Sequence, residues 1–180
     1  MRRLMLLRHA KTEHDAPSGR DQDRRLDHRG HRDATEIGGW IARHPPFPDT
    51  VLVSHAIRAH QTWEVAWEAM KDLVPKPVVE LMPELYGADS AELLEIIRHA
   101  SEADPRRLLL VGHNPGMHEL ALALAGSGDP AGRKALADNL PTSGLAIFDF
   151  DIDDWADVAF RRGRLVLFIS PKLLKHASDE

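Results

Sequence analysis

The sequence predicts an α/β fold with three layers, in which helices cover both faces of a mostly parallel, mixed central sheet. Short apolar runs that are nearly continuous, rather than alternating, are typical of strands buried on both faces. Between these runs lie segments whose apolar residues recur at three- and four-residue spacing, as in amphipathic helices. Strands and helices that alternate along a chain indicate a layered, mainly parallel sheet. The strands are expected at 4–7, 50–53, 108–111, 145–150 and 165–169.

Four helices are expected between these strands. The first shows the helical spacing at Ala34, Ile37 and Ile41. Proline is favoured at the first position of a helix, because the N–H that it lacks would have no partner there. The helices are therefore expected over 29–44 and 56–74, after Asp89 or Ser90 with Glu92 in the first turn, and from Pro115, with Asn114 as N-cap, to near Gly126.

Two connecting segments affect the topology. An acidic stretch without a helix of crossover length separates the last two strands, so these strands are expected to pair antiparallel. The segment 11–27 is long and charged and has no periodicity. Loops of this length in a compact domain are usually functional or disordered, and we expect this one to cover part of a site. No shift in composition marks a boundary, so residues 1–180 are expected to form a single domain.

Composition excludes several classes of function. The 180 residues are 43% apolar and carry a formal net charge of −5, which disfavours a nucleic-acid binder. The chain has no cysteine, which excludes disulfides, thiolate zinc sites and a cysteine nucleophile. No apolar stretch approaches the length of a membrane span, and the run that follows Arg3 is too short for a signal peptide. We expect a cytoplasmic protein, a monomer, with no membrane partner.

Positive charge is concentrated near the N-terminus. Residues 1–33 contain nine Lys or Arg and six Asp or Glu, a local charge of +3, whereas the remaining residues carry −8. A small basic region on an acidic chain favours a small anionic ligand over an extended polyanion.

Arginine and histidine follow three of the predicted strands. The first strand leads into Arg8-His9, the second into Ser54-His55 with Arg58 soon after, and the third into Gly112-His113-Asn114. The carboxyl ends of parallel strands meet at one edge of a sheet, where ligands gather. Arginine forks and helix N-termini both bind phosphoryl oxygens. The pattern therefore predicts a site for a phosphate-like dianion at this edge.

The same residues lie in motifs that resemble the histidine phosphatase superfamily. The segment 7–12, Leu-Arg-His-Ala-Lys-Thr, is similar to the Arg-His-Gly signature, and its Ala-Lys variant is similar to short phosphohistidine phosphatases of the SixA type. The resemblance implies a phosphoglycerate mutase-like fold and a phosphatase that acts on a phosphorylated protein histidine or a small phosphorylated metabolite. Four further blocks resemble the family in the same order, at 25–30, 54–62, 111–116 and 141–144.

Carried onto matching positions, the resemblance implies a role for each candidate residue. His9 is the nucleophile that becomes phosphorylated, while Arg8, Arg58 and His113 hold the phosphoryl oxygens. Glu84 is the best match for the acid that protonates the leaving group, and Asp21 and Asp23 are weaker candidates for that role. Arginines can supply the charge that Mg²⁺ supplies elsewhere, so no metal or other cofactor is implied. Thr12, Asn114 and His55 are the candidates for substrate binding.

Two other interpretations remain open from the sequence. One is a catalytically inactive relative that binds phosphorylated ligands, although the nucleophile is present. The other is a Mg²⁺-dependent phosphohydrolase that uses Asp149 and Asp151, which follow an apolar strand. Further acidic residues surround this pair, and a solvated acidic turn explains them more simply.

Overall fold

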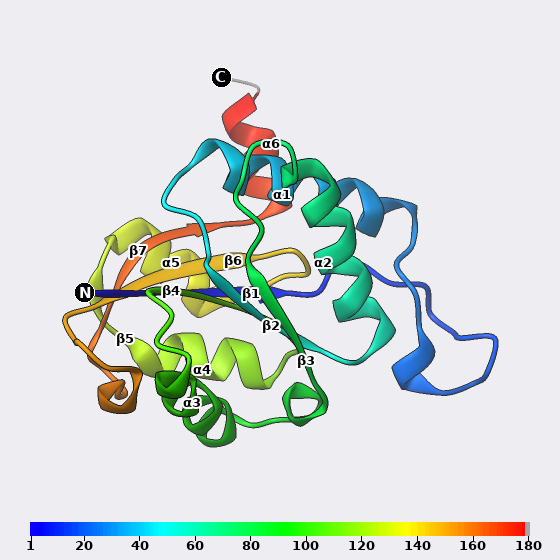
Figure 1. The fold of residues 1–180 in the computed structure, drawn as a ribbon. Coiled ribbons are helices and arrows are strands. Elements are labelled where there is room, and N and C mark those ends of the chain that lie inside the picture. The colour runs from blue at the N-terminus through cyan, green and yellow to red at the C-terminus, as the bar shows by residue number, and fades with distance from the viewer. Residues whose placement is uncertain (179–180) are drawn as a thin grey trace.

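The computed structural model describes residues 1–178, which contain a seven-stranded sheet in the order β3-β2-β4-β1-β6-β7-β5 (Figure 1). The helices are α1 (His28–Arg43), α2 (Ile57–Met70), α3 (Ser90–His99), α4 (Gly116–Leu124), α5 (Pro130–Asp138) and α6 (Pro171–Ser178). The strands are β1 (Arg2–Arg8), β2 (Thr50–Ser54), β3 (Val78–Met82), β4 (Arg107–Gly112), β5 (Ala125–Gly128), β6 (Leu145–Phe150) and β7 (Gly163–Ile169).

The sheet is mixed, as the sequence predicts. Strands β1 to β4 pair in parallel, through β1 with β4, β4 with β2 and β2 with β3. Strand β6 runs antiparallel to both β1 and β7. The expected fold class and the expected antiparallel pairing of the last two long strands are therefore confirmed.

Side chains that alternate along the central strands separate two apolar cores, one on each face of the sheet. Leu4 and Leu6 of β1 point into a core that they share with α3, α4 and Trp155. Met5 and Leu7 point the other way, into a core with α1 and α2. Figure 1 shows α1 and α2 on one side of the sheet and α3 and α4 on the other. Burial on both faces explains why these strands are continuous apolar runs.

All four expected helix starts lie within one residue of the observed starts. Asp27 caps α1 by accepting the N–H of Gly30, and Asp89 and Glu92 form a capping box on α3. The fourth helix begins at Gly116 rather than Pro115, because the N-cap position falls on Pro115. Asn114 is therefore not the N-cap, although its side-chain oxygen accepts the N–H of His118 at 3.2 Å.

Four elements have no counterpart in the sequence prediction. Strand β3 lies at an edge of the sheet and most of its residues are exposed, so it lacks the fully apolar signature. Strand β5 consists of Ala-Gly-Ser-Gly, residues with little preference for strands. Helix α5 is short but conventionally started, with Asp129 as N-cap and Pro130 at the first position. Helix α6 is the fourth.

Two glycines in α1 bring neighbouring backbone close to the helix. A Cβ on Gly30 would lie 2.0 Å from the carbonyl oxygen of Lys11, and one on Gly38 would lie 2.3 Å from that of Ala66 in α2. The first contact holds the chain that follows β1 against the start of α1. The second sets the close packing of α1 on α2. Among the described residues, no helix is both long and apolar enough to span a bilayer.

Candidate active site

The three predicted strand ends meet in the structure. Arg8, the last residue of β1, lies opposite Gly112 of β4, and Val53 of β2 lies opposite Val111 of the same strand. The side chains that follow these strands are therefore neighbours at the carboxyl ends of the parallel strands. The arrangement is the one that parallel pairing of the first three predicted strands requires.

His9 is held in a single orientation. Its ring is buried, with 8% of the residue exposed, and Nδ1 lies 2.8 Å from the carbonyl oxygen of Ala10. A carbonyl can only accept, so Nδ1 carries the proton and Nε2 presents its lone pair. Burial lowers the pKa of His9 to about 3, and the nearby His113, Arg58 and Arg8 act in the same direction. The ring is therefore neutral at physiological pH.

The backbone around His9 is fixed by contacts from two parts of the chain. The N–H of Ala10 donates to Oγ1 of Thr62 in α2 at 2.9 Å, and this hydroxyl donates to the carbonyl of Arg58 at 2.6 Å. The N–H of Ser143, in the turn before β6, lies 3.1 Å from the carbonyl oxygens of both Arg8 and His9. Ser143 adopts a positive φ of 59°, the left-handed conformation. These contacts tie the peptide of His9 to α2 and to the turn before β6.

Two arginines stand beside the imidazole. Arg58 is 7% exposed, and Arg8 donates from Nη1 to the carbonyl of Leu140 at 3.2 Å. Burial lowers the pKa of Arg8, and the positive charge of Arg58 lowers it further. The two guanidinium groups are therefore close enough to repel each other. The Nε of Arg8 is buried and has no hydrogen-bond partner within the described residues. Two cations brought this close favour an anionic occupant between them.

His113 completes the cluster. Its ring centroid lies 5.3 Å from that of His9, and its Nε2 shares a hydrogen bond of 2.7 Å with Oγ of Ser54. The residue is 9% exposed. Burial lowers the pKa of His113 to about 4, and the charge of Arg58 adds to the effect. His113 is therefore also neutral at physiological pH.

The predicted loop reaches the site through Asp21. One carboxylate oxygen, Oδ2, accepts from Nη2 of Arg58 at 2.9 Å and from the hydroxyl of Tyr86 at 2.6 Å. The carbonyl of Asp21 accepts from Nη1 of Arg58 at 2.8 Å. Tyr86 also meets the rings of His113 and His55 edge-on, at centroid distances of 5.5 and 5.7 Å. Asp21, Tyr86 and His55 thus form one side of the site's mouth.

The remaining candidates from the sequence, Thr12, Asn114 and Glu84, make contacts outside the His9 cluster. Thr12 accepts a hydrogen bond from Arg24 at 2.6 Å, within the loop. Asn114 uses both ends of its amide on backbone, donating to the carbonyl of Leu140 at 2.8 Å. Glu84 is exposed and lines a small pocket with Glu92 and Glu95 of α3. Within the described residues, no hydrogen bond or ion pair joins Glu84 to the His9 cluster.

Sequence reasoning assigned no role to several residues of this site. Ser54 and Thr62 stand in the second motif and Ser143 in the last, but small hydroxyl residues are common and carry no distinctive signal by themselves. Tyr86 is the single tyrosine of the chain, two residues beyond Glu84, and the structure brings Tyr86 to the cluster. The motifs marked the positions of these residues without indicating their contacts.

The acidic pair that suggested a magnesium enzyme lies elsewhere. The two carboxylate oxygens of Asp149 bind Nε and Nη2 of Arg3, at 2.8 and 2.9 Å. Arg3 is near the start of β1, so this ion pair lies at the opposite end of the strand from His9. Asp151 is exposed. Because arginine already occupies both oxygens of Asp149, the donor set does not fit a catalytic magnesium.

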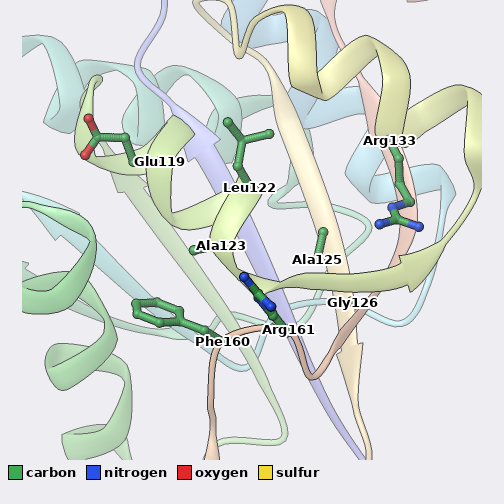
Figure 2. Close-up of a pocket in the computed structure, with 8 residues that line it drawn as sticks. All are labelled: Glu119, Leu122, Ala123, Ala125, Gly126, Arg133, Phe160 and Arg161. Carbon is green, nitrogen blue, oxygen red and sulfur yellow. The ribbon is translucent and has the colours of Figure 1, made fainter.

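A separate pocket of about 720 Å³ also lies away from the cluster (Figure 2). It is formed by the second half of α4, the start of β5 and the chain before β7, and its lining includes Leu122, Phe160, Arg133 and Arg161. None of the residues of the His9 cluster contributes to it. The chemistry described above belongs to the strand-end cluster and not to this pocket.

Comparison with known proteins agrees with this geometry. Residues 4–87 match the sequence model of the histidine phosphatase superfamily (branch 1). The uncharacterised protein Rv1276c of Mycobacterium tuberculosis is 37% identical over 169 residues, which cover 92% of this chain and all of the relative.

Two solved structures are similar along almost their whole length. The SixA protein of Agrobacterium tumefaciens, assigned as a phosphohistidine phosphatase, is 34% identical, with a TM-score of 0.77 over 94% of this chain and 98% of its own. SixA of Nakamurella multipartita is 30% identical, with a TM-score of 0.79 over 94% and 96% of the two chains. The chain therefore belongs to the histidine phosphatase superfamily, branch 1, and is of the SixA type.

Proposed function

We propose that the protein is a metal-independent phosphatase that forms a phosphohistidine intermediate on His9. The observation that carries this proposal is the ring of His9, whose Nδ1–H is bound to the Ala10 carbonyl while Nε2 remains free beside Arg8, Arg58 and His113. A neutral, oriented imidazole is a nucleophile, and guanidinium groups match the oxygens of a transferring phosphoryl group.

In the first step, Nε2 of His9 attacks the phosphorus atom opposite the leaving group. A P–N bond forms, the bond from phosphorus to the leaving oxygen or nitrogen breaks, and the departing group takes up a proton. Charge spreads over three equatorial oxygens during this transfer. In the proposed step, Arg8, Arg58 and His113 bind these oxygens, and electrostatic stabilisation of this kind is the largest contribution that such a site makes.

In the second step, water attacks the phosphorus atom and the P–Nε2 bond breaks. Inorganic phosphate leaves, one proton of the water is released, and His9 returns to its neutral form. The hydrogen bond from Nδ1 to Ala10 persists through both steps and keeps the ring aligned. Because no hydrogen bond or ion pair joins the exposed Glu84 to the cluster within the described residues, the proposal assigns it no proton transfer.

The proposed substrate is a phosphorylated protein histidine, with a phosphomonoester as the second candidate. The two SixA structures of 34% and 30% identity support the first choice, since both are assigned as phosphohistidine phosphatases. A phosphorylated imidazole also suits a site without an assigned acid, because the imidazole leaves readily once it is protonated. The half-exposed side chain of Asp21 lies at the mouth of the site.

Replacement of the nucleophile tests the proposal. We expect His9→Ala to lower the hydrolysis of p-nitrophenyl phosphate on the order of a thousandfold or more, and chelators to leave the wild-type rate unchanged. His14→Ala, which removes an exposed histidine of the neighbouring loop, is the matched control and keeps the wild-type rate. Hydrolysis that survives in His9→Ala would reject the nucleophile.

The intermediate gives an independent test. Rapid quenching with a ³²P-labelled substrate is expected to trap label on the protein in a form that base preserves and acid releases, as a phosphoramidate requires. Label that is stable to acid would contradict a phosphohistidine. Tight binding of phosphate with no turnover of phosphorylated histidine or aryl phosphate would instead support the inactive, ligand-binding relative.

A further inference from the structure

An acidic side chain is fixed on one of the two arginines that we assign to the phosphoryl group. Arg58 uses two of its five N–H donors for hydrogen bonds to Asp21, one to the carboxylate at 2.9 Å and one to the backbone carbonyl at 2.8 Å. The contact joins residues 37 positions apart, from a short 3₁₀ turn at Asp21–Asp23 to the first turn of α2. It therefore depends on the tertiary fold and not on local chain geometry.

Tyr86 and Arg24 hold the carboxylate in this position. The Tyr86 hydroxyl donates to the same oxygen, Oδ2, that Arg58 binds, at 2.6 Å, and Arg24 binds Oδ1 at 3.1 Å. The hydroxyl of Tyr86, together with the two arginines, keeps the pKa of Asp21 well below its ordinary value. The side chain of Asp21 is nevertheless 49% exposed. A fixed negative charge thus faces solvent at the mouth of an anion site.

We propose that Asp21 is a specificity-determining residue, an inference that rests on the phosphatase function proposed above. Its carboxylate beside Arg58 disfavours phosphorylated compounds that carry a second anionic group close to the phosphoryl group. Compounds whose leaving group is neutral or cationic are favoured.

Local charge explains the selectivity. Arg8 and Arg58 supply two positive charges to the cluster, and both near histidines are neutral at physiological pH. The carboxylate of Asp21 offsets one of these charges from a distance of 2.9 Å. A single phosphoryl group still finds donors on both guanidinium groups. A further carboxylate or phosphate on the leaving group meets the fixed carboxylate of Asp21 across a few ångströms, where like charges repel appreciably even near a protein surface.

Two ligands that differ in one charged group measure this selectivity. Glycerol 3-phosphate and 3-phosphoglycerate share a carbon skeleton, but the second carries a carboxylate. Both are used as competitive inhibitors of p-nitrophenyl phosphate hydrolysis, so neither needs to be a substrate. We expect wild type to bind glycerol 3-phosphate more tightly. In Asp21→Asn, we expect the ratio of the two inhibition constants to shift about five- to tenfold towards 3-phosphoglycerate.

Two variants separate the placed carboxylate from charge in general. Asp15→Asn removes the same charge from an exposed position in the same loop, away from Arg58, and should leave the ratio unchanged. Tyr86→Phe removes the hydroxyl that fixes Oδ2 and should shift the ratio part of the way towards that of Asp21→Asn. In wild type, raising KCl from 50 to 500 mM should reduce the discrimination, because salt screens exposed charges.

The outcomes distinguish this inference from the proposed function. An unchanged ratio in Asp21→Asn, with hydrolysis that still depends on His9, rejects the role of Asp21 alone. An equal shift in Asp15→Asn rejects it as well, since the placed carboxylate would then have no special effect. Hydrolysis that persists in His9→Ala rejects the proposed function itself, whatever the inhibition constants show. Circular dichroism of Asp21→Asn confirms that the variant is folded.

Discussion

His9 and His113 are buried beside two arginines, which is an unusual environment for histidine. A buried imidazole is disfavoured in its charged form, and the neighbouring arginines disfavour that form further. The lowered pKa values, to about 3 for His9 and about 4 for His113, follow from these two causes. The Nε2 atom of His9, the nucleophile proposed above, carries no proton across the physiological range and needs no separate base to activate it.

The protonation of these two rings can be observed directly. We expect the ring resonances of His9 and His113 in an NMR titration to stay constant from pH 8 to pH 5, because neither ring binds a proton in this range. Free imidazole in the same sample serves as the reference. A midpoint between pH 6 and 7 for His9 would contradict the buried, neutral ring.

The same shifts predict how stability depends on pH. Between about pH 6.5 and pH 3, the unfolded state binds a proton at His9 that the folded state does not bind, so the free energy of unfolding decreases as the pH falls. Over the whole window the loss is on the order of a few kcal/mol. Urea unfolding of His9→Gln at pH 7 and pH 4.5 should show a smaller loss than wild type shows.

At the scale of secondary structure, the close packing of α1 on α2 positions Arg58 and Thr62. The backbone of α1 at Gly38 lies against the carbonyl of Ala66, two turns along α2 from Arg58. A Cβ on the adjacent Gly39 would instead lie 3.1 Å from Nη1, at the flexible end of the Arg43 side chain. Two neighbouring glycines in one helix therefore have different physical roles.

This difference gives a matched pair of variants. We expect Gly38→Ala to lower the free energy of unfolding by about 1–3 kcal/mol, because the new methyl group forces the two helices apart. Gly39→Ala should be neutral or stabilising by up to about 1 kcal/mol, since alanine favours the helix and Arg43 can move aside. Urea midpoints measure both. Equal effects of the two substitutions would argue against a tight α1–α2 contact.

The elements that the sequence predicts are those whose burial is uniform. Strands β1, β2 and β4 lie inside the sheet and are apolar on both faces, so a continuous run identifies them. Strand β3 is an edge strand with an exposed pattern, and β5 is rich in glycine, so neither leaves a periodic signal. Their places depend on pairing with β2 and β7, which are distant in sequence.

The site was predictable to the same extent as the strands that carry it. Arg8, His9, Arg58 and His113 each follow a predicted strand, and parallel register alone brings them together. The contact of Asp21 with Arg58 and Tyr86 could not be found in this way. It depends on how the 17-residue loop 11–27 folds back onto α2. Thr62 and Ser143 act on backbone groups, and no sequence pattern indicates such contacts.

For the molecule as a whole, the two ends of the central strands have different roles. The His9 cluster lies at the carboxyl end of β1, and the ion pair of Arg3 and Asp149 lies near the amino end of the same strand. Arg164 extends this pair, with Nη2 at 3.4 Å from Asp149. This arrangement is that of a structural ion pair between β1, β6 and β7.

Loss of this ion pair should affect stability and not catalysis. We expect Asp149→Asn to lower the free energy of unfolding by about 2 kcal/mol, because Arg3 loses its carboxylate partner. The rate of aryl phosphate hydrolysis should stay within about twofold of wild type. Asp151→Asn, an exposed neighbour, should change neither quantity. A folded Asp149→Asn protein without activity would revive the magnesium interpretation.

The turn at Ser143 has a consequence for how the molecule is assembled during synthesis. Its N–H reaches the carbonyls of Arg8 and His9, and the following strand pairs with β1, although about 130 residues separate these partners along the chain. A ribosome would release the first strand long before the turn that fixes it. The arrangement of the peptide at His9 is therefore among the last features that the growing polypeptide acquires, and a nascent chain shorter than this turn lacks the contacts that fix it.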